Sequence, residues 1–395
     1  MHSGAKLSHF ILFKELNLDR VVKLGQAHTG LYCSKKNIHE VCPKCANPSR
    51  TIYDHRTVKL ADAPIRGTRV TLVVKKRRLW CKHCRKPFTE PIAGVRKKKR
   101  HTERFDRQLR WACDTFSDLK QVRRQFRCSA RYVYEAYYRQ LELRRRTRLS
   151  PWPKVIGIDE HAFRRNRAFG HTEFASMIVD YTNKRVKEVV EGKTTAALSD
   201  QLAYIPERQN VQAVVIDMCD PFKNFACEFF PHAKIIADKF HVLRLLSPAL
   251  LRKRKEIVGS RADLKAKKLL LCSSKKLGYF ERRTLKDFLW RYPDLHELYD
   301  WKEKLHRFYR TLGYHNAAKA LRKLIDNMAW SLLPEIKSLR KTLIRWKEQI
   351  LNYFLLGYTN ARTEGFNNKA KVVKRRAYGY RSFKNYRLRV LDACS

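Results

Sequence analysis

The chain has 395 residues, with 86 Lys and Arg against 37 Asp and Glu, which gives a formal net charge of +49. An excess of this size resists compaction unless a polyanion neutralises it, so the composition predicts nucleic acid as the partner. A membrane surface is disfavoured, because the basic residues are spread through the sequence rather than gathered beside an apolar anchor. Since no apolar run reaches 18 residues, we expect no membrane span and a cytoplasmic, nucleoid-associated protein with reduced or metal-bound cysteines.

Four regions can be distinguished along the chain. Residues 1–40 form an N-terminal leader without a diagnostic feature, and residues 41–100 carry paired cysteines. The basic run 96–100 that closes this second region is typical of a linker. Residues 101–148 have a helical pattern throughout. From 149 to 395 short apolar strands alternate with helices, which indicates an α/β domain.

The second region contains two C-x-x-C knuckles separated by 35 residues. Two knuckles bring four thiolates together as a closed tetrahedron around one Zn²⁺, which is the arrangement of a structural site. The predicted zinc ligands are Cys42, Cys45, Cys81 and Cys84. Reduced thiols without metal are one alternative, and a redox pair is another, which the lack of a strand-to-helix turn at either knuckle disfavours. We expect the remaining cysteines to be buried thiols; they are Cys33, Cys113, Cys128, Cys219, Cys227, Cys272 and Cys394.

The third region predicts a helix, a tight turn and a second helix between residues 119 and 138. Ser129 lies in the turn, where its side chain can cap the second helix. The outer face of that second helix carries residues suited to phosphates and base edges in a major groove. These predicted DNA-binding residues are Arg131, Tyr132, Tyr134 and Arg139. An ordinary helical hairpin is the alternative, but the neighbouring zinc module and the overall charge favour a helix-turn-helix domain.

The fourth region begins with an alternation of strands and helices. Short apolar runs predict strands at 155–158, 176–180, 186–190, 211–216 and 234–237, with helices at 194–203 and after Pro221. Three strands, a helix, a strand, a helix and a strand is the order of a ribonuclease-H-like core. From about 242 to 350 the sequence becomes almost wholly helical, and a last helical pair occupies about 360–392.

Three acidic residues stand where metal chemistry would need them. Phosphodiester cleavage by metal uses carboxylates that hold two divalent ions about 3.5–4 Å apart. Asp159 and Asp217 each end an apolar strand, and Glu364 begins a late helix. The first and fourth strands of a ribonuclease-H-like sheet are neighbours, so the two aspartates should project side by side. Burying like charges this close is costly unless a cation joins them, so we expect the three acids to hold Mg²⁺ or Mn²⁺.

Simpler interpretations of the two aspartates remain open. Asp159 could merely cap the following turn, and its neighbour Glu160 should point to the other face of the sheet. Asp220 competes with Asp217 for the second position, but it has the character of a turn residue before a proline. We therefore favour Asp217.

The third acid and a nearby polar pair also have alternatives. Glu364 could be an ordinary exposed helix charge, although the adjacent Gly365 suggests a close approach of the backbone. Asp238 and His241 lie at the end of a strand. Asp238 could orient His241 near the scissile phosphate, or the pair could stabilise the turn, and the sequence does not separate these two interpretations.

Several blocks are similar to the signatures of one family. They are Ile158–Glu160, Ile216–Met218, Phe230–Ala233, Ala237–Val242 and Asn360–Asn368, which continues into Lys374–Tyr380. Together they resemble the ISL group of bacterial insertion-sequence DDE transposases, over nearly the whole chain. The resemblance implies a zinc-binding domain and a helix-turn-helix for terminal inverted repeats, then a DDE domain with a helical insertion at about 242–350. It places the catalytic triad on Asp159, Asp217 and Glu364, and Asp238 and His241 on the C/D-x-x-H motif of several DDE groups.

The sequence therefore predicts a DNA transposase that binds the terminal inverted repeats of an insertion sequence and carries out metal-dependent DNA cleavage and strand transfer. Its partner is double-stranded DNA, and synapsis of two ends suggests a homodimer or a larger assembly. One alternative is a structure-directed nuclease, which would share the fold and metals but scarcely need the zinc module and helix-turn-helix. The other is a non-catalytic DNA-binding regulator derived from a transposase, against which the presence of all three carboxylates argues.

Overall fold

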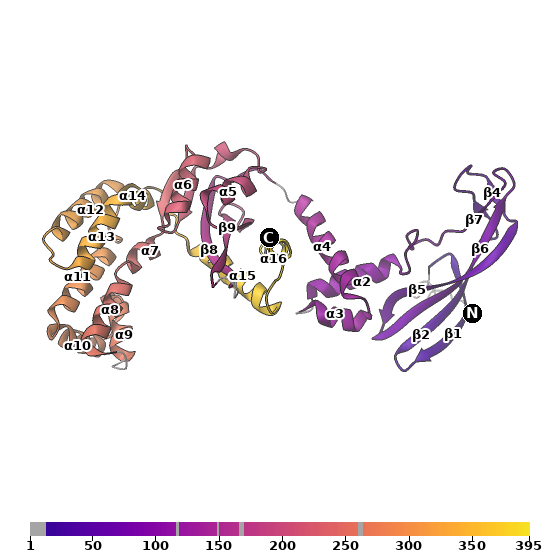
Figure 1. The fold of residues 1–395 in the computed structure, drawn as a ribbon, viewed down its shortest axis with the longest axis horizontal. Coiled ribbons are helices and arrows are strands. Elements are labelled where there is room, and N and C mark those ends of the chain that lie inside the picture. The colour runs from indigo at the N-terminus through magenta and orange to yellow at the C-terminus, as the bar shows by residue number, and fades with distance from the viewer. Residues whose placement is uncertain (1–12, 116–117, 148–149, 166–169, 260–263) are drawn as a thin grey trace. The chain divides into compact units, whose positions relative to one another are not determined.

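The structure is a computed structural model that describes residues 13–115, 118–147, 150–165, 170–259 and 264–395. The chain divides into two compact units, Met1–Leu143 and Arg144–Ser395 (Figure 1). Within the described residues, no helix has both the length and the apolar character needed to cross a membrane.

The first unit is built on a five-stranded sheet. Its strands are β1 (Leu16–Gly25), β2 (His28–Lys35), β5 (Ile52–Ile65), β6 (Thr68–Cys81) and β7 (Lys86–Thr89). They are ordered β1-β2-β6-β5, β7 pairs with β6, and β2 and β6 run parallel. A short hairpin of β3 (Glu40–Val41) and β4 (Pro48–Ser49) carries the first cysteine knuckle between its strands.

Strands β1 and β2 occupy much of the region 1–40, where we expected a leader with a short amphipathic piece around 10–24 and no diagnostic feature. The apolar side chains of β1 gave no alternating signal, because Leu18, Val21 and Leu24 are 42%, 58% and 45% exposed on this edge strand. Period-two alternation appears only where one face of a strand is buried and the other is solvated. Residues 16–35 therefore belong to the same sheet as the cysteine region.

The basic run 96–100 differs from the free linker that we expected. The N–H of Ala61 in β5 donates to the carbonyl of Arg100 at 2.9 Å, and the N–H of Thr102 donates back to Ala61 at 3.0 Å. The Thr102 hydroxyl also donates to the buried carboxylate of Asp62 at 2.6 Å. These bonds fix the run along β5, so the sheet and the helices that follow form one unit.

Three helices complete the first unit: α2 (Glu103–Thr115), α3 (Leu119–Phe126) and α4 (Ala130–Thr147). Helices α3 and α4 are the predicted pair. The turn between them bends at Arg127, whose φ of 48° is left-handed, and Ser129 Oγ accepts from the N–H of Tyr132 at 3.2 Å as the expected cap. Val122 and Val133 are buried on the facing sides of the two helices.

The second unit contains a five-stranded sheet of order β10-β9-β8-β11-β12. The strands are β8 (Val155–Arg165), β9 (Thr172–Asp180), β10 (Arg185–Glu191), β11 (Ala213–Ile216) and β12 (Lys234–Ala237). Strands β8, β9 and β10 are antiparallel, whereas β11 runs parallel to both β8 and β12. All five strands overlap their predicted ranges, but β8 continues to Arg165, so Asp159 lies inside this strand and not at its end as predicted.

Helices cover both faces of this sheet. On one face, alternate residues of the strands, such as Ile156 and Ile158, pack with α5 (Thr195–Leu202) and α6 (Asp220–Phe229). On the other face, the intervening residues, such as Val155, pack with α15 (Ala361–Arg376) and α16 (Phe383–Ala393). Residues from opposite ends of the domain sequence therefore meet across β8 (Figure 1).

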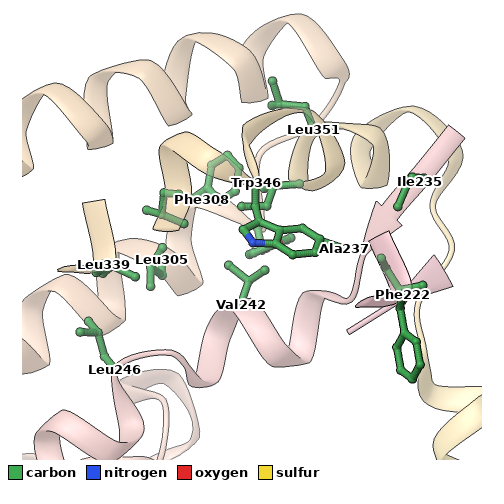
Figure 2. Packing of buried hydrophobic residues seen from close by; sticks show 14 of the residues in the cluster. Phe222, Ile235, Ala237, Val242, Leu246, Leu305, Phe308, Leu339, Trp346 and Leu351 are labelled. Carbon is green, nitrogen blue, oxygen red and sulfur yellow. The ribbon is translucent and has the colours of Figure 1, made fainter. Parts of the chain in front are cut away.

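The stretch 242–350 is helical as predicted. It comprises most of α7 (Lys239–Arg244), α8 (Ser247–Val258), α9 (Leu264–Leu271), α10 (Tyr279–Trp290), α11 (Pro293–Phe308), α12 (Tyr314–Met328), α13 (Pro334–Arg345) and the start of α14 (Lys347–Leu356). Helix α13 ends at Arg345 and α14 begins at Lys347, with Trp346 between them. Figure 2 shows the fully buried Trp346 near Val242 and Phe308, in a core that continues to Ala237 of β12.

Candidate active site

Strand β11 ends at Ile216 beside the middle of β8, which continues to Arg165. Ile216 pairs with Ile158 in parallel register, and Asp217 and Asp159 are the next residues of the two strands. The side-by-side placement predicted from the sequence is therefore present. Its physical basis is the parallel register, which places the residues that follow Ile158 and Ile216 next to each other.

Asp217 lies in a buried and electronegative position. Its Oδ1 atom is buried and has no hydrogen-bond partner in the described part of the chain, and the same holds for Oε2 of Glu160. Burial, followed by the negative charges of Glu160 and Asp159, raises the pKa of Asp217 to about 7. Two neighbouring carboxylates, each with a buried oxygen that lacks a hydrogen-bond partner, are unfavourable unless a proton or a cation lies between them.

Glu160 lies on the other side of β8 from Asp159, as expected: Asp159 bonds to Asn367 of α15, whereas Glu160 is 3.6 Å from Lys193, just before α5. An oxygen of Glu160, an oxygen of Asp217 and the sulfur of Cys219 all lie within 4.8 Å of one another. The reason is that Asp217 follows the last residue of β11, and the N–H of Cys219 turns back to the Asp217 carbonyl at 2.8 Å. The turn after β11, and not the alternation of β8, therefore brings Asp217 close to Glu160.

Asp159 is held by hydrogen bonds to both of its oxygens. Oδ2 accepts from the Nδ2 amide of Asn367 in α15 at 2.8 Å, and Oδ1 accepts from the N–H of Glu160 at 2.8 Å. Burial raises its pKa above the usual aspartate value, although these two hydrogen bonds oppose the shift. The Asp159 carboxylate is therefore fixed in orientation from the α15 side.

Asp238 caps α7 and is 2% exposed. Its Oδ2 accepts from the N–H and from Nδ1 of His241, at 3.2 and 3.0 Å, and its Oδ1 accepts from the N–H of Asn360 at 2.9 Å. Burial alone would raise the Asp238 pKa, but the hydrogen bonds from His241 and Asn360 lower it. The bond to Asp238 in turn raises the pKa of His241, and the charges of Asp217 and Asp159 act in the same direction. The turn-stabilising contact is present, and a role near the scissile phosphate stays a prediction.

Glu364 lies in the first turn of α15 and is exposed. It is one helical turn from Asn360 and from Asn367, whose polar groups contact Asp238 and Asp159 respectively. Residues four and three apart share one side of a helix, so Glu364 is on the same side of α15 as Asn360 and Asn367, but its carboxylate does not join the close group of Glu160, Asp217 and Cys219. Its part in a metal site stays a prediction.

Our interpretation of Gly365 was wrong, and the close backbone approach occurs at another glycine. A Cβ atom at Gly365 would meet nothing within 4 Å, whereas one at Gly157 would lie 2.2 Å from Thr363 Oγ1 and 2.6 Å from Tyr181. The Tyr181 hydroxyl also lies 3.0 Å from Thr363 Oγ1. Gly157 of β8 therefore allows α15, which carries Glu364, to approach the sheet.

The substitution Gly157→Ala should separate α15 from β8. The added methyl group has to push Thr363 and Tyr181 away, and overpacking of this kind costs about 1–3 kcal/mol of unfolding free energy. We expect a lower urea midpoint together with weaker DNA cleavage. The matched control is Gly365→Ala, which should be neutral or stabilising by up to about 1 kcal/mol because it removes a glycine from a helix. Equal midpoints for the two variants would contradict this account of the packing.

The donor set at this edge fits a hard divalent cation. Carboxylate oxygens are the ligands that Mg²⁺ and Mn²⁺ prefer, and two of them are buried here without a partner among the residues that the structure describes. Glu160 is partly compensated by Lys193, whose Nζ is 3.6 Å from its other oxygen. The charge of His241 lowers the pKa of Asp217, but burial and the charges of Glu160 and Asp159 outweigh it.

The four knuckle cysteines converge as predicted. The sulfur atoms of Cys42, Cys45, Cys81 and Cys84 lie within 4.8 Å of one another, and those of Cys45 and Cys81 are 3.5 Å apart. Zinc–sulfur bonds of about 2.3 Å in a tetrahedron require sulfur separations of about 3.8 Å, so this cluster can hold one zinc ion. Hydrogen bonds from the backbone of Lys44 and Cys45 lower the pKa of Cys42 to about 7 against the opposing effect of burial, which favours the thiolate that zinc needs.

The other cysteines only partly follow the expectation of buried thiols. Cys33, Cys113 and Cys394 are buried, and Cys128, Cys219 and Cys272 are partly exposed. Cys227 is exposed, because the buried side of α6 is formed by Phe222, Phe225, Ala226 and Phe229 and its other side faces outward.

Comparison with known proteins decides the family. The sequence profile of the ISL3 transposases matches residues 156–390, which contain both aspartates and Glu364. The chain belongs to the ISL3 transposase family. A second profile, described as the zinc-finger of transposase IS204/IS1001/IS1096/IS1165, matches residues 39–84 and so includes the four knuckle cysteines of this ISL3 transposase.

Individual relatives agree with this assignment. The transposase for insertion sequence element IS1001 of Bordetella parapertussis is 26% identical over 371 residues, which cover 89% of this ISL3 transposase and 88% of the relative. A protein of Lactococcus lactis subsp. lactis named an ATP-dependent protease is 41% identical over 61 residues, or 15% of this chain and 20% of that protein. A match this short does not support assigning the activity of that protein to this chain.

The expected DNA-reading face of α4 differs at one residue. Arg131, Tyr134 and Arg139 are exposed, and Arg131 pairs with Glu135 at 2.6 Å. The Tyr132 hydroxyl instead lies 2.8 Å from Nε2 of His101 and donates to Asp106, so this side chain packs against α2 and is not free to contact DNA. The helical wheel could not show this, because Tyr132 sits at the border between the buried and exposed sides of α4.

Sequence reasoning missed three residues of the site: Glu160, Gly157 and Asn367. Gly157 stood inside a strand pattern, where a glycine often marks close backbone approach, and that signal was available. Asn367 lies three residues after Glu364, on the same side of the helix, and could have been found from that spacing. Nothing in the sequence distinguished Glu160, because its placement depends on the turn after β11.

Proposed function

We propose that this ISL3 transposase cuts double-stranded DNA at the terminal inverted repeats of an insertion sequence and joins the freed 3′ ends to target DNA, using two divalent metal ions. The observation that supports this most strongly is the pair of buried, unpartnered oxygens of Asp217 and Glu160 beside Asp159. Such a site is costly for a protein that only binds DNA, and it is what a cation-dependent enzyme requires.

The catalytic domain is proposed to have a ribonuclease-H-like fold with a helical insertion between β12 and α15. The strand order β10-β9-β8-β11-β12 supports this, as does the change from antiparallel to parallel pairing at β8. In this arrangement the two central strands deliver Asp159 and Asp217, and a helix distant in sequence delivers Glu364.

Each residue has a proposed role at the scissile phosphate. Asp159, Asp217 and Glu364 hold Mg²⁺ or Mn²⁺, which when bound activates the attacking oxygen and stabilises the leaving oxygen. Asp238 orients His241 through Nδ1, which leaves Nε2 available to donate to a phosphate oxygen. Because the pKa of His241 is raised, the protonated imidazole that such a contact needs is favoured.

DNA recognition is proposed to lie in the first unit. Arg131, Tyr134 and Arg139 of α4 are exposed and suited to a major groove, and the zinc ion would hold the cysteine hairpins in place. Cleavage and joining of two element ends calls for a homodimer or a larger assembly on DNA. The net charge of +49 supports binding to DNA backbones.

The test is cleavage of labelled DNA that carries an end of the protein's own element, in Mg²⁺ and in EDTA. The proposal expects binding that prefers the element end over shuffled DNA and cleavage at the end in Mg²⁺ only. Cleavage without sequence preference would favour the structure-directed nuclease. Specific binding without cleavage in Mg²⁺ or Mn²⁺ would favour the non-catalytic regulator.

A further inference from the structure

A line of three hydrogen bonds runs through the core to Asp159. The Tyr386 hydroxyl lies 2.5 Å from Nε2 of His161, and Nδ1 of His161 lies 2.9 Å from Oδ1 of Asn367. The Nδ2 amide of Asn367 then donates to Oδ2 of Asp159 at 2.8 Å. Tyr386, His161 and Asn367 are 0%, 4% and 2% exposed, so these bonds are shielded from water.

The direction of the line follows from what each group can donate. An ionised carboxylate only accepts, so the amide nitrogen of Asn367 faces Asp159 and its oxygen faces His161. His161 must therefore carry its hydrogen on Nδ1. No carboxylate contacts the His161 ring among the described residues, and a lone buried cation is costly, so the ring is neutral and Nε2 accepts from the Tyr386 hydroxyl. In each of the three hydrogen bonds the donor is therefore the residue farther from Asp159 along the line.

We propose that Asn367 is a positioning residue for Asp159 and that His161 and Tyr386 set the orientation of the Asn367 amide. The amide fixes one oxygen of Asp159 while the Glu160 N–H fixes the other, which leaves the remaining lone pairs for a cation shared with Asp217. The same bond joins α15 to β8 three residues from Glu364, so it also sets the distance between the first and third acids. The inference rests on the proposed role of Asp159 in metal binding.

The first test reads the His161 ring in the wild-type protein without metal. The protein is labelled with ¹⁵N-histidine, and the His161 signals are assigned by comparison with His161→Gln. We expect the neutral Nδ1–H tautomer. A ring protonated on Nε2 alone would overturn the proposal, because Asn367 would then have to present its nitrogen to His161 and its oxygen to Asp159.

The second test measures Mn²⁺ binding by calorimetry for Asn367→Leu, with Asn368→Leu on the exposed side of the same helix as the control. Removal of an outer hydrogen-bond partner typically weakens a metal site by about tenfold to a hundredfold, and we expect that loss for Asn367→Leu only. Tyr386→Phe, which removes one hydroxyl, should show a smaller loss in the same direction. If the wild type binds Mn²⁺ and Asn367→Leu binds equally well, the positioning role is wrong. If the wild type itself fails to bind Mn²⁺, the proposed function is at fault instead.

A second, independent feature lies in the first unit. A cavity of about 250 Å³ opens between the β5–β6 hairpin and the end of α3, and three of the residues that line it are Arg69, Arg124 and Arg127. None of the three guanidinium groups has a hydrogen bond or an ion pair in the described chain. The one acid at the cavity, Asp62, already accepts from Arg104 and Thr102.

We infer that this arginine cavity binds a backbone phosphate of DNA beside the α3–α4 turn. Arginine forks match phosphate oxygens, and three unpaired guanidinium groups around one hollow repel each other until an anion joins them. The positive charges of Arg69 and Arg127 also act on nearby His28, whose pKa is lowered first by burial and then by these two charges. The phosphate contact would set the register of the α4 helix on the duplex.

The test compares two double variants. The first combines Arg69→Gln with Arg127→Asn. The control combines Lys23→Gln with Lys59→Gln, which removes the same charge from exposed positions of the sheet. Asparagine tolerates the left-handed backbone of Arg127. For element-end DNA, the arginine pair should lower the slope of log affinity against log salt by about one for each phosphate that the protein no longer neutralises. A slope equal to that of the lysine pair would overturn the inference. If the DNA affinity of the wild-type protein does not depend on salt, the proposed DNA binding is contradicted instead.

Discussion

Asp217→Asn should abolish DNA cleavage and raise the melting temperature of the metal-free protein. The cleavage rate should fall by about a thousandfold or more, because a metal ligand contributes several kcal/mol to the transition state and each 1.36 kcal/mol is about tenfold. Stability should change in the opposite sense, because the variant removes a buried charge that faces Glu160 and Asp159. Opposite effects on activity and stability are the signature of a functional site rather than a structural ion pair.

The gain in stability should depend on pH in a defined direction. The pKa of Asp217 is about 7 in the folded protein and 3.8 for an ordinary aspartate, so between these values the folded state holds a proton that the unfolded chain has lost. The free energy of unfolding of the metal-free wild type should therefore decrease as pH rises from about 4 to about 7. Asp217→Asn should not show that decrease at this site, so the difference between the two proteins should be largest above pH 7.

The measurement is thermal melting of both proteins in EDTA across this pH range, together with cleavage in Mg²⁺. Asp220→Asn is the matched control, because Asp220 is a nearby exposed aspartate that pairs with Arg345 at 3.3 Å. We expect Asp220→Asn to cleave DNA at the wild-type rate. A less stable Asp217→Asn protein at pH 8 would show that the carboxylate is a structural group and not a destabilising metal ligand.

Cys81→Ser should release the zinc ion and with it the fold of the cysteine hairpins. Zinc binding by four cysteines contributes on the order of 10 kcal/mol to folding, and little else holds β3, β4 and β7, which have 2, 2 and 4 residues. We expect loss of specific binding to the element end, whereas cleavage of pre-nicked DNA by the second unit should persist. Zinc content measured on the purified protein and DNA binding by fluorescence anisotropy would check this.

Cys227→Ser is the control for the zinc experiment, because Cys227 is an exposed thiol in the other unit. It should keep the zinc content and the DNA affinity of the wild type. Full zinc content and unchanged specific binding in Cys81→Ser would show that the cysteine cluster is not the zinc site on which DNA recognition depends.

Much of the second unit could be predicted because its signals are local. Buried strands appear as short apolar runs, and the aspartates that end two of them could be placed together once the strand order was inferred. The cysteine knuckles were equally clear, since their spacing is short within each pair. The edge strand β1 was missed because its exposed Leu18, Val21 and Leu24 carry no alternation.

The remaining parts of the site depend on contacts between residues far apart in sequence. Asn367 bonds to Asp159 across 208 positions, and Thr363 packs on Gly157 across a similar span. No periodicity along the chain reports which strand a late helix will cross. For the same reason the sequence indicates Gly365 as the packing glycine when Gly157 has that role, and it does not show that Glu160 lies beside Asp217.

The most direct test of a three-carboxylate metal site uses Asp159→Asn, Asp217→Asn and Glu364→Gln in parallel. Each full-length variant is incubated with labelled element-end DNA in Mg²⁺ or Mn²⁺, and binding is measured on the same samples. We predict that all three bind the end with wild-type affinity and that none cuts it. Wild-type cleavage by Glu364→Gln would contradict the three-carboxylate site, because the helix that carries this acid would then have no part in holding the ions.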